Sequence, residues 1–186
     1  MPKIINDIEK KIFEAVIKII QEKGYKGLNM KIVASEASIA VGTLYNYYSD
    51  KKDLASSVFY ESWNDSIYKI KKCLKEVDDV EDRADKFICL IYKEFKKRRG
   101  VGFELIKNDV IDKNRHQKIK RELDSILKDI ISDLEAERGI NLGEDTKKRV
   151  VHTFFSILIN LIIAYENEDE ENIEFIRNAL YRLLKK

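Results

Sequence analysis

The chain has 186 residues, of which 44% are apolar and 37% are charged, and it contains one proline and seven glycines. Because so few residues break helices, this composition predicts an all-α protein with one large or two small domains. The formal net charge of +2 is too small to indicate nucleic-acid binding by itself. Residues 1–54 carry nine lysines against seven carboxylates, so the small excess of positive charge lies at the N-terminal end.

The cysteine content and the apolar runs predict a soluble, cytoplasmic protein. Cys73 and Cys89 are too few for a disulfide framework and too far apart for a metal or redox motif, so free thiols are expected. Asp7 and Glu9 interrupt the N-terminus, which therefore lacks the apolar core of a secretory signal. The longest uncharged run, 153–165, is shorter than the roughly 20 residues that span a bilayer, and no membrane association is expected.

The first elements predicted along the chain are three short to medium helices. Apolar residues at three- and four-residue steps predict an amphipathic helix over 5–23, which Gly24 ends. Asn29 is expected to cap a second helix over 30–37, because its side-chain oxygen can accept from the free N–H groups of the first turn. Two turn residues follow, and a third short helix is predicted over about 41–47.

Six further helices complete the predicted fold. The acidic stretch 166–171 separates the last two, and its carboxylates favour the N-terminus of the final helix through the helix dipole. The predicted ranges are 51–76, 81–98, a shorter helix carrying Phe103, Ile106 and Val110, 115–138, 145–166 and 170–185.

The segment 42–54, Gly-Thr-Leu-Tyr-Asn-Tyr-Tyr-Ser-Asp-Lys-Lys-Asp-Leu, carries most of the functional information. It places three tyrosines, one threonine and two lysines near two helix N-termini, where hydroxyls and ammonium groups suit contacts to phosphate oxygens. The helix over 30–37, the turn and the helix over 41–47 together form a predicted helix-turn-helix.

This segment resembles the TetR/AcrR family of transcriptional repressors, which typically carry Gly-Thr-Leu-Tyr-x-His-Phe-x-x-Lys-x-x-Leu. Similarity of motif covers about residues 12–54. The resemblance implies three N-terminal helices, a connecting fourth helix and five more in a regulatory domain. It divides the chain into a DNA-binding domain, 1–50, and an effector-binding and dimerisation domain, 51–186.

The resemblance implies a DNA-binding set at the predicted helix-turn-helix. A recognition helix meets bases and backbone with its N-terminal residues, and the hydroxyls of Tyr45 and Tyr47 match positions that bind phosphates. Leu44 and Tyr48 are expected to face the core instead. The full expected set is Asn29, Lys31, Val41, Gly42, Thr43, Tyr45, Tyr47 and Lys51.

The segment departs from the family pattern at three positions. Ser38 and Ala40 stand where the family usually has Gly and Ser, so Ser38 caps the recognition helix from one turn earlier or the cap is missing. Tyr47 replaces the common histidine. The first arginine of the chain is Arg83, so the N-terminal domain lacks the bidentate arginine contact to guanine. We expect an operator that favours A·T pairs, with lysine as the alternative partner for a guanine.

The regulatory domain is expected to bind a small, mainly apolar effector. Aromatic residues on its helices are candidates for the pocket, although aromatics at helical spacing are more often plain core. Trp63 on the connecting helix is the strongest candidate, and the expected set is Tyr60, Trp63, Phe87, Phe103 and Phe155.

The helix over 145–166 is apolar almost all round, so several neighbours must bury it. With the last helix it predicts a four-helix interface between two copies; the alternative is a central helix in a monomer. The expected interface residues are Phe154, Leu158, Ile162, Ile176 and Leu180.

No catalytic, metal or cofactor site is predicted. The chain contains no Glu-x-x-His pair of the kind found in di-iron bundles, no phosphate-loop motif and no nucleophile motif. Arg98 and Arg99 follow two lysines and are interpreted as a solvated helix end, with contact to an effector phosphate as the alternative. We therefore expect a ligand-responsive repressor that binds a palindromic operator as a homodimer. The rival hypothesis is a helical protein-interaction module that has lost DNA binding.

Overall fold

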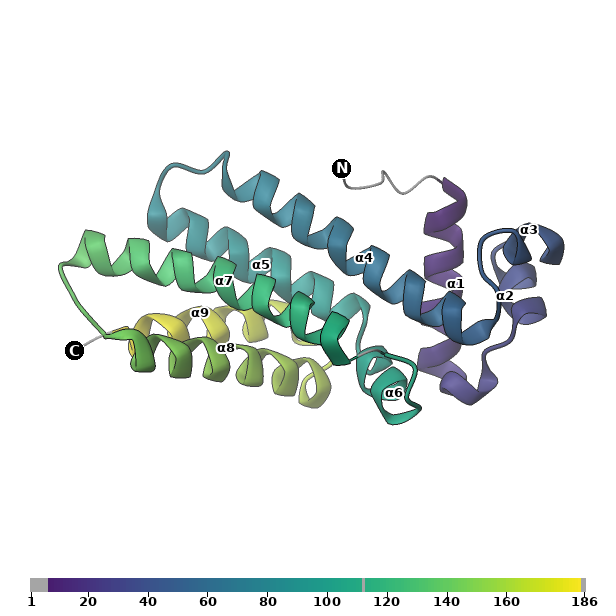
Figure 1. The fold of residues 1–186 in the computed structure, drawn as a ribbon. Helices are drawn as coiled ribbons and strands as arrows, with labels where there is room; N and C mark the ends of the chain where they lie inside the picture. Colours follow the sequence, from purple (N-terminus) through teal and green to yellow (C-terminus); the bar gives the residue numbers. More distant parts are fainter. Residues whose placement is uncertain (1–6, 112, 185–186) are drawn as a thin grey trace. The chain divides into compact units, whose positions relative to one another are not determined.

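The computed structural model describes residues 7–111 and 113–184, and these residues form an all-α fold, as predicted. Nine α-helices and one short 3₁₀ helix make up this part of the chain (Figure 1). Their bounds are α1 (Asp7–Lys23), η1 (Tyr25–Gly27), α2 (Met30–Glu36), α3 (Val41–Tyr45), α4 (Lys51–Leu74), α5 (Val80–Lys97), α6 (Val101–Lys107), α7 (Lys113–Arg138), α8 (Glu144–Ala164) and α9 (Asp169–Leu183).

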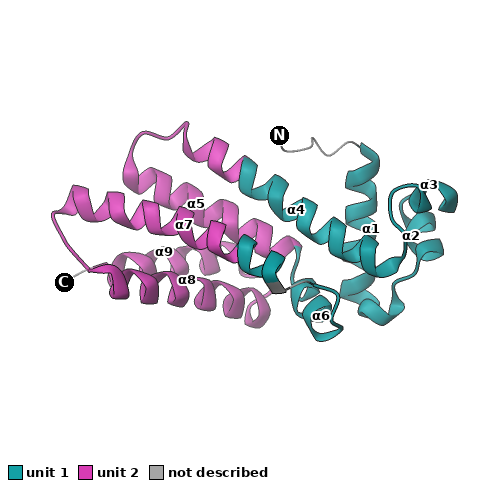
Figure 2. Ribbon diagram, viewed as in Figure 1, with its two compact units in different colours: residues 1–68, 98–119 teal, residues 69–97, 120–186 magenta. Residues whose placement is uncertain are grey.

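The chain divides into two compact units, coloured separately in Figure 2. Unit 1 comprises residues 1–68 and 98–119, and unit 2 comprises 69–97 and 120–186. The predicted domains, 1–50 and 51–186, follow the functions expected from the sequence, whereas the two units follow packing. Unit 1 therefore adds the first part of α4 and the segment that contains α6 to the predicted helix-turn-helix.

The core of unit 1 follows the predicted periodicity of α1. Ile12, Val16 and Ile19 are buried, and α1 ends at Gly24, whose φ of 67° lies in the left-handed region that glycine adopts without strain. The segment around α6 returns to this end of α1, because the backbone N–H of Tyr25 donates to Glu104 Oε2 at 3.3 Å.

Arg98 belongs to the core of unit 1, which corrects its interpretation as part of a solvated helix end. The residue is only 4% exposed, and its guanidinium donates to Ser62 Oγ at 3.0 Å and to Ser66 Oγ at 2.8 Å. The same group lies 4.5 Å from the Trp63 ring, a cation–π contact. Sequence could not show this, because a basic run at the end of a helix is usually solvated.

Unit 2 packs α5 against α8 and α9 through aromatic and polar contacts. The Phe87 and Phe154 rings have centroids 6.0 Å apart, which joins α5 to α8. At the start of α9, Asp169 accepts from Lys96 Nζ at 2.6 Å and from the Tyr92 hydroxyl at 3.0 Å. The Lys96 ammonium is the main cause that holds the pKa of Asp169 below its usual value, so this carboxylate stays ionised.

Candidate DNA-binding surface

The helix-turn-helix of unit 1 consists of α2, a tight turn and α3. Asn29 caps α2 as predicted, since its Oδ1 accepts from the Ile32 N–H at 2.9 Å. Ser38 ends α2 in the left-handed region with a φ of 55°, and the Ile39 N–H donates back to the Ala34 carbonyl at 2.9 Å. These features form a Schellman-type C-cap that turns the chain into α3.

The short helix α3, predicted to be the recognition helix, has no side-chain cap. Ala40 occupies its N-cap position and cannot accept a hydrogen bond, and no side chain caps the helix from elsewhere in the described residues. Of the two alternatives for Ser38, the structure therefore supports the missing cap. A serine at position 40 would supply the acceptor that the N-terminal N–H groups of a helix normally find.

One face of α3 is buried and the opposite face is open to solvent. Leu44 is fully buried and Tyr48 is 6% exposed, as predicted. Burial, and to a smaller extent the nearby Glu61 carboxylate, raises the pKa of Tyr48 well above its usual value, so its hydroxyl stays protonated. Gly42 and Asn46 each lie two residues from Leu44, about 160° around the helix axis, and both are exposed.

Four polar side chains at the open face of α3 take part in no hydrogen bond of the described residues, although the Tyr47 and Tyr48 ring centroids lie 6.3 Å apart. Tyr45 and Tyr47 are 54% and 51% exposed. Within the described residues, no hydrogen bond engages the hydroxyls of Thr43, Tyr45 and Tyr47 or the side-chain amide of Asn46. Four groups able to donate and accept therefore remain available for an external partner.

Gly42 is a glycine that neither its backbone nor its packing requires. Its φ lies outside the positive region, and a Cβ added there would meet no atom within 4 Å. The missing side chain leaves the α3 backbone accessible at the middle of the exposed face. A glycine at this position is explained if another molecule comes close to the backbone of α3.

The N-terminus of α4 positions Lys51 beside this surface. Asp50 caps the helix, since its Oδ1 accepts from the N–H groups of Lys52 at 2.7 Å and Asp53 at 2.8 Å. Lys51 Nζ lies 4.7 Å from the centroid of the Tyr25 ring, which fixes its stem, and the side chain stays half-exposed.

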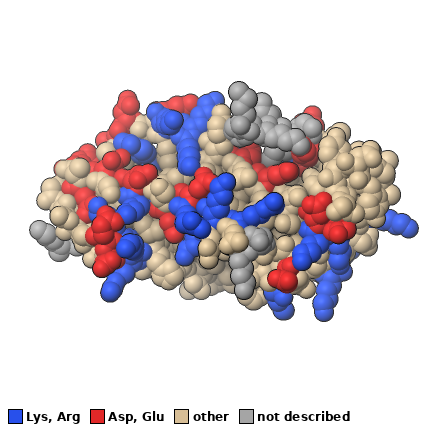
Figure 3. All heavy atoms as spheres, in the orientation of Figure 1, with Lys and Arg blue, Asp and Glu red and all other residues tan. Residues whose placement is uncertain are grey.

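All eight residues predicted for DNA binding belong to unit 1. Five of them are exposed, and Val41, Thr43 and Lys51 are half-exposed. Residues 37–49 carry no charge, and on the face shown in Figure 3 the part of unit 1 at the upper right, around α3, is largely tan. Asn46, which is outside the predicted set, is also exposed on this face, and its four-residue offset from Gly42 could have placed it there.

The five residues predicted for an effector pocket are divided between the two units. In unit 1, Tyr60 and Trp63 are buried on α4, whereas Phe103 on α6 is 72% exposed. In unit 2, Phe87 is fully buried and Phe155 packs against Phe95 with ring centroids 5.9 Å apart. Neither unit by itself brings these five aromatic residues together.

The five residues predicted for a dimer interface are core residues of unit 2. Each is at most 3% exposed in the single chain, so none has appreciable surface left for a partner to cover. Other apolar residues on α8, at its C-cap and on α9 are exposed: Ile159, Ile163, Tyr165, Phe175 and Leu183. Because α8 is apolar almost all round, its sequence could not indicate which stripe faces its own core.

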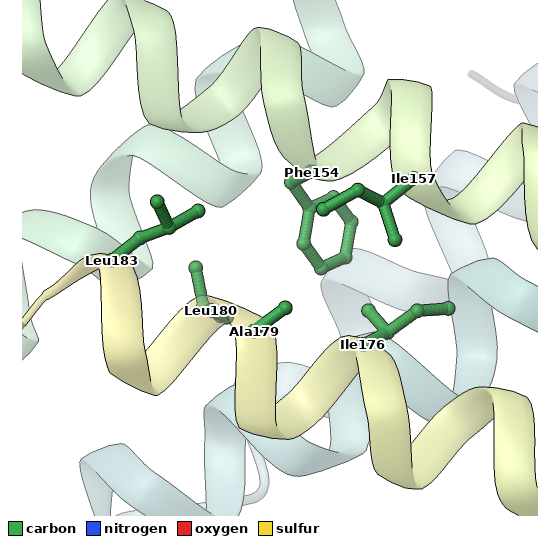
Figure 4. A pocket seen from close by; sticks show the side chains of 6 residues that line it. All are labelled: Phe154, Ile157, Ile176, Ala179, Leu180 and Leu183. Atoms are coloured by element: carbon green, nitrogen blue, oxygen red, sulfur yellow. The ribbon is translucent and has the colours of Figure 1, made fainter.

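A shallow apolar groove lies between α8 and α9, and Leu183 of the exposed set is one of its lining residues. Figure 4 shows the side chains that line it, Phe154 and Ile157 from α8 and Ile176, Ala179, Leu180 and Leu183 from α9. The described residues contain no group of His, Cys, Asp and Glu side chains that could hold a metal ion. No helix among them is long and apolar enough to cross a membrane.

The sequence matches one family model. It is described as "Bacterial regulatory proteins, tetR family" and covers residues 12–58, which run from α1 into α4 and include the surface built above. The Fatty acid metabolism regulator protein of Bacillus subtilis (strain 168) is 26% identical over 135 residues, covering 72% of this chain and 68% of that protein.

Two solved structures share the fold along nearly the whole chain. The fatty acid degradation regulator FadR from Bacillus halodurans has a TM-score of 0.75 at 18% identity, covering 98% of this chain and 97% of that one. The transcriptional regulator FadR from Bacillus subtilis, in complex with stearoyl-CoA, has a TM-score of 0.70 at 17% identity, covering 95% and 97%.

Proposed function

Because this chain is a TetR-family transcriptional regulator and not an enzyme, we propose that it binds duplex DNA through α3 and represses transcription in the cytoplasm. The observation that carries the proposal is the open face of α3, whose hydroxyl and amide groups make no hydrogen bond within the described residues. Groups of this kind suit base edges and phosphate oxygens in a major groove.

Two lysines flank this face and are proposed to hold the phosphate backbone. Lys31 is exposed in the first turn of α2, and Lys51 begins α4. Helix N-termini favour anions through the helix dipole, so a phosphate beside either lysine gains from the dipole as well as from the ammonium charge. Tyr45 and Tyr47 are proposed to donate hydroxyl hydrogen bonds to the same backbone.

The test of DNA binding is the salt dependence of affinity for a duplex, measured by fluorescence anisotropy. Lys31→Ala and Lys51→Ala are each expected to weaken binding to all sequences about equally and to lower the log–log salt slope by about one. Lys75→Ala, an exposed lysine of unit 2, serves as the control and should change neither value. Absence of binding by the wild type at low salt would favour the rival protein-interaction module.

We further propose that the regulator is a homodimer joined through exposed apolar residues of α8 and α9. Ile163 and Phe175 are 63% and 57% exposed, and large apolar residues of this kind on neighbouring helices mark an interface. A two-fold symmetric pair of α3 helices would read a palindromic operator with half-sites about one helical turn apart.

The proposed effector is a small, mainly apolar molecule, and a long-chain acyl thioester is the class that fits best. A protein of the same fold was solved in complex with stearoyl-CoA. The buried side chains of the unit 2 helices are mainly leucine, isoleucine and phenylalanine. Binding of such a ligand is proposed to shift α4 and release the operator, a coupling that is typically worth about 1–3 kcal/mol.

Trp63 provides the readout for this effector, because it is the only tryptophan in the chain and the Arg98 guanidinium lies 4.5 Å from its ring. Stearoyl-CoA is expected to weaken operator binding at least about tenfold and to change Trp63 emission. Acetyl-CoA, which has the same nucleotide head without the long chain, should do neither. Release of the operator with unchanged emission would place the ligand away from this tryptophan.

A further inference from the structure

Asn46 has a position on α3 that the fold does not explain. It ends the helix with φ −69° and ψ −21°, so it continues the helical path. Its backbone N–H is engaged with the Gly42 carbonyl at 3.1 Å, which fixes where the side chain begins. The side chain is exposed, and no hydrogen bond engages its amide within the described residues.

The surroundings of Asn46 leave space for a base pair to approach. Gly42 lies one turn before Asn46 on the same exposed face, and no atom lies within 4 Å of its absent Cβ. The buried Leu44 and Tyr48 hold the opposite face against the core of unit 1. The carboxamide of Asn46 therefore lies on the exposed face next to Gly42, where no side chain covers the backbone.

The chemistry of this face favours adenine and thymine over guanine. Guanine is most often read by a bidentate arginine, or by lysine, but residues 37–49 carry no cation. An asparagine carboxamide pairs with adenine, donating to N7 and accepting from the N6 amino group. The methyl groups of Val41 and Thr43, which are half-exposed, can contact the C5 methyl of thymine.

We propose that Asn46 is a specificity-determining residue that reads one adenine in each half-site, and that the base pairs contacted by α3 are A·T pairs. This inference rests on the proposed DNA binding and deepens it. Val41 and Thr43 supply apolar contacts to thymines beside that adenine, whereas Lys31 and Lys51 hold the phosphates without selecting a sequence.

The experiment begins with selection of duplexes from a random pool by the full-length wild-type protein. The selected half-sites are expected to be conserved as A·T at the positions that α3 contacts. Replacing the adenine read by Asn46 with 7-deazaadenine removes only the N7 acceptor and should weaken wild-type binding about tenfold. Replacing a contacted thymine with deoxyuridine removes only the C5 methyl and should weaken binding by a smaller factor.

Asn46→Ala identifies the residue, and the thermal unfolding of this variant should match the wild type because the side chain has no described partner. It should bind the natural duplex about tenfold more weakly, lose its preference at one base pair and become insensitive to 7-deazaadenine there. Tyr45→Phe is the control: it should weaken all duplexes alike and keep the sensitivity to 7-deazaadenine.

Different outcomes would contradict the adenine contact of Asn46 and the DNA binding on which it rests. Enrichment of G·C pairs at the contacted positions, or equal loss of affinity for all sequences in Asn46→Ala, would remove the adenine contact while leaving DNA binding intact. Enrichment of no duplex at all would remove the proposed function, and this inference with it.

Discussion

Replacing Ile163 and Phe175 together by glutamate is expected to convert the protein from a dimer into monomers and to abolish operator binding. Both residues are more than half exposed in the single chain, so glutamate is tolerated in the folded monomer. In the proposed interface each would become a buried charge without a partner, which costs several kcal/mol per site. Light scattering should show the mass falling to that of one chain, 21.8 kDa.

The control for this experiment is Phe103→Glu, which adds the same charge at a residue that is 72% exposed on α6 in unit 1. It should leave the mass unchanged. Phe154→Glu, at a residue that is only 2% exposed, is expected to unfold the protein and not to dissociate a folded dimer. A double variant that stays dimeric would move the interface to another face, and a monomeric wild type would remove the dimer proposal.

Gly42→Ala is expected to stabilise the protein while it weakens operator binding about tenfold or more. Alanine is favoured over glycine in a helix by about 0.5–1 kcal/mol, and here its methyl group meets no atom within 4 Å. The same methyl group would stand between the α3 backbone and the major groove. Thermal unfolding and anisotropy with the selected duplex measure the two opposite effects.

Gly102→Ala is the matched control for Gly42→Ala, because it adds the same atom to another helix of unit 1. There the new Cβ would lie 3.3 Å from Phe59 Cζ, so the change acts on internal packing. It should alter thermal stability and leave operator affinity unchanged. Unchanged operator affinity in Gly42→Ala would show that this position does not approach the DNA.

The sequence by itself determined the helices and the helix-turn-helix, because the signals for these are local. Gly24 ends α1 and Asn29 caps α2, as their residue types predict. Burial of Leu44 and Tyr48 was also expected from the motif and is confirmed, although Tyr48 lies beyond the last residue of α3. The family motif lies within this locally specified part of the chain.

The tertiary structure decided which side chains are buried and which are exposed, because this depends on the helices that pack against each other. α8 is apolar on nearly every side, so only packing against α5 and α9 assigns Phe154 to the core and Ile163 to the surface. From the sequence, Arg98 is expected to be a solvated charge. In the structure its guanidinium donates to Ser62 and Ser66, which lie more than thirty residues earlier. Such contacts join segments distant in sequence, and no local propensity or spacing encodes them.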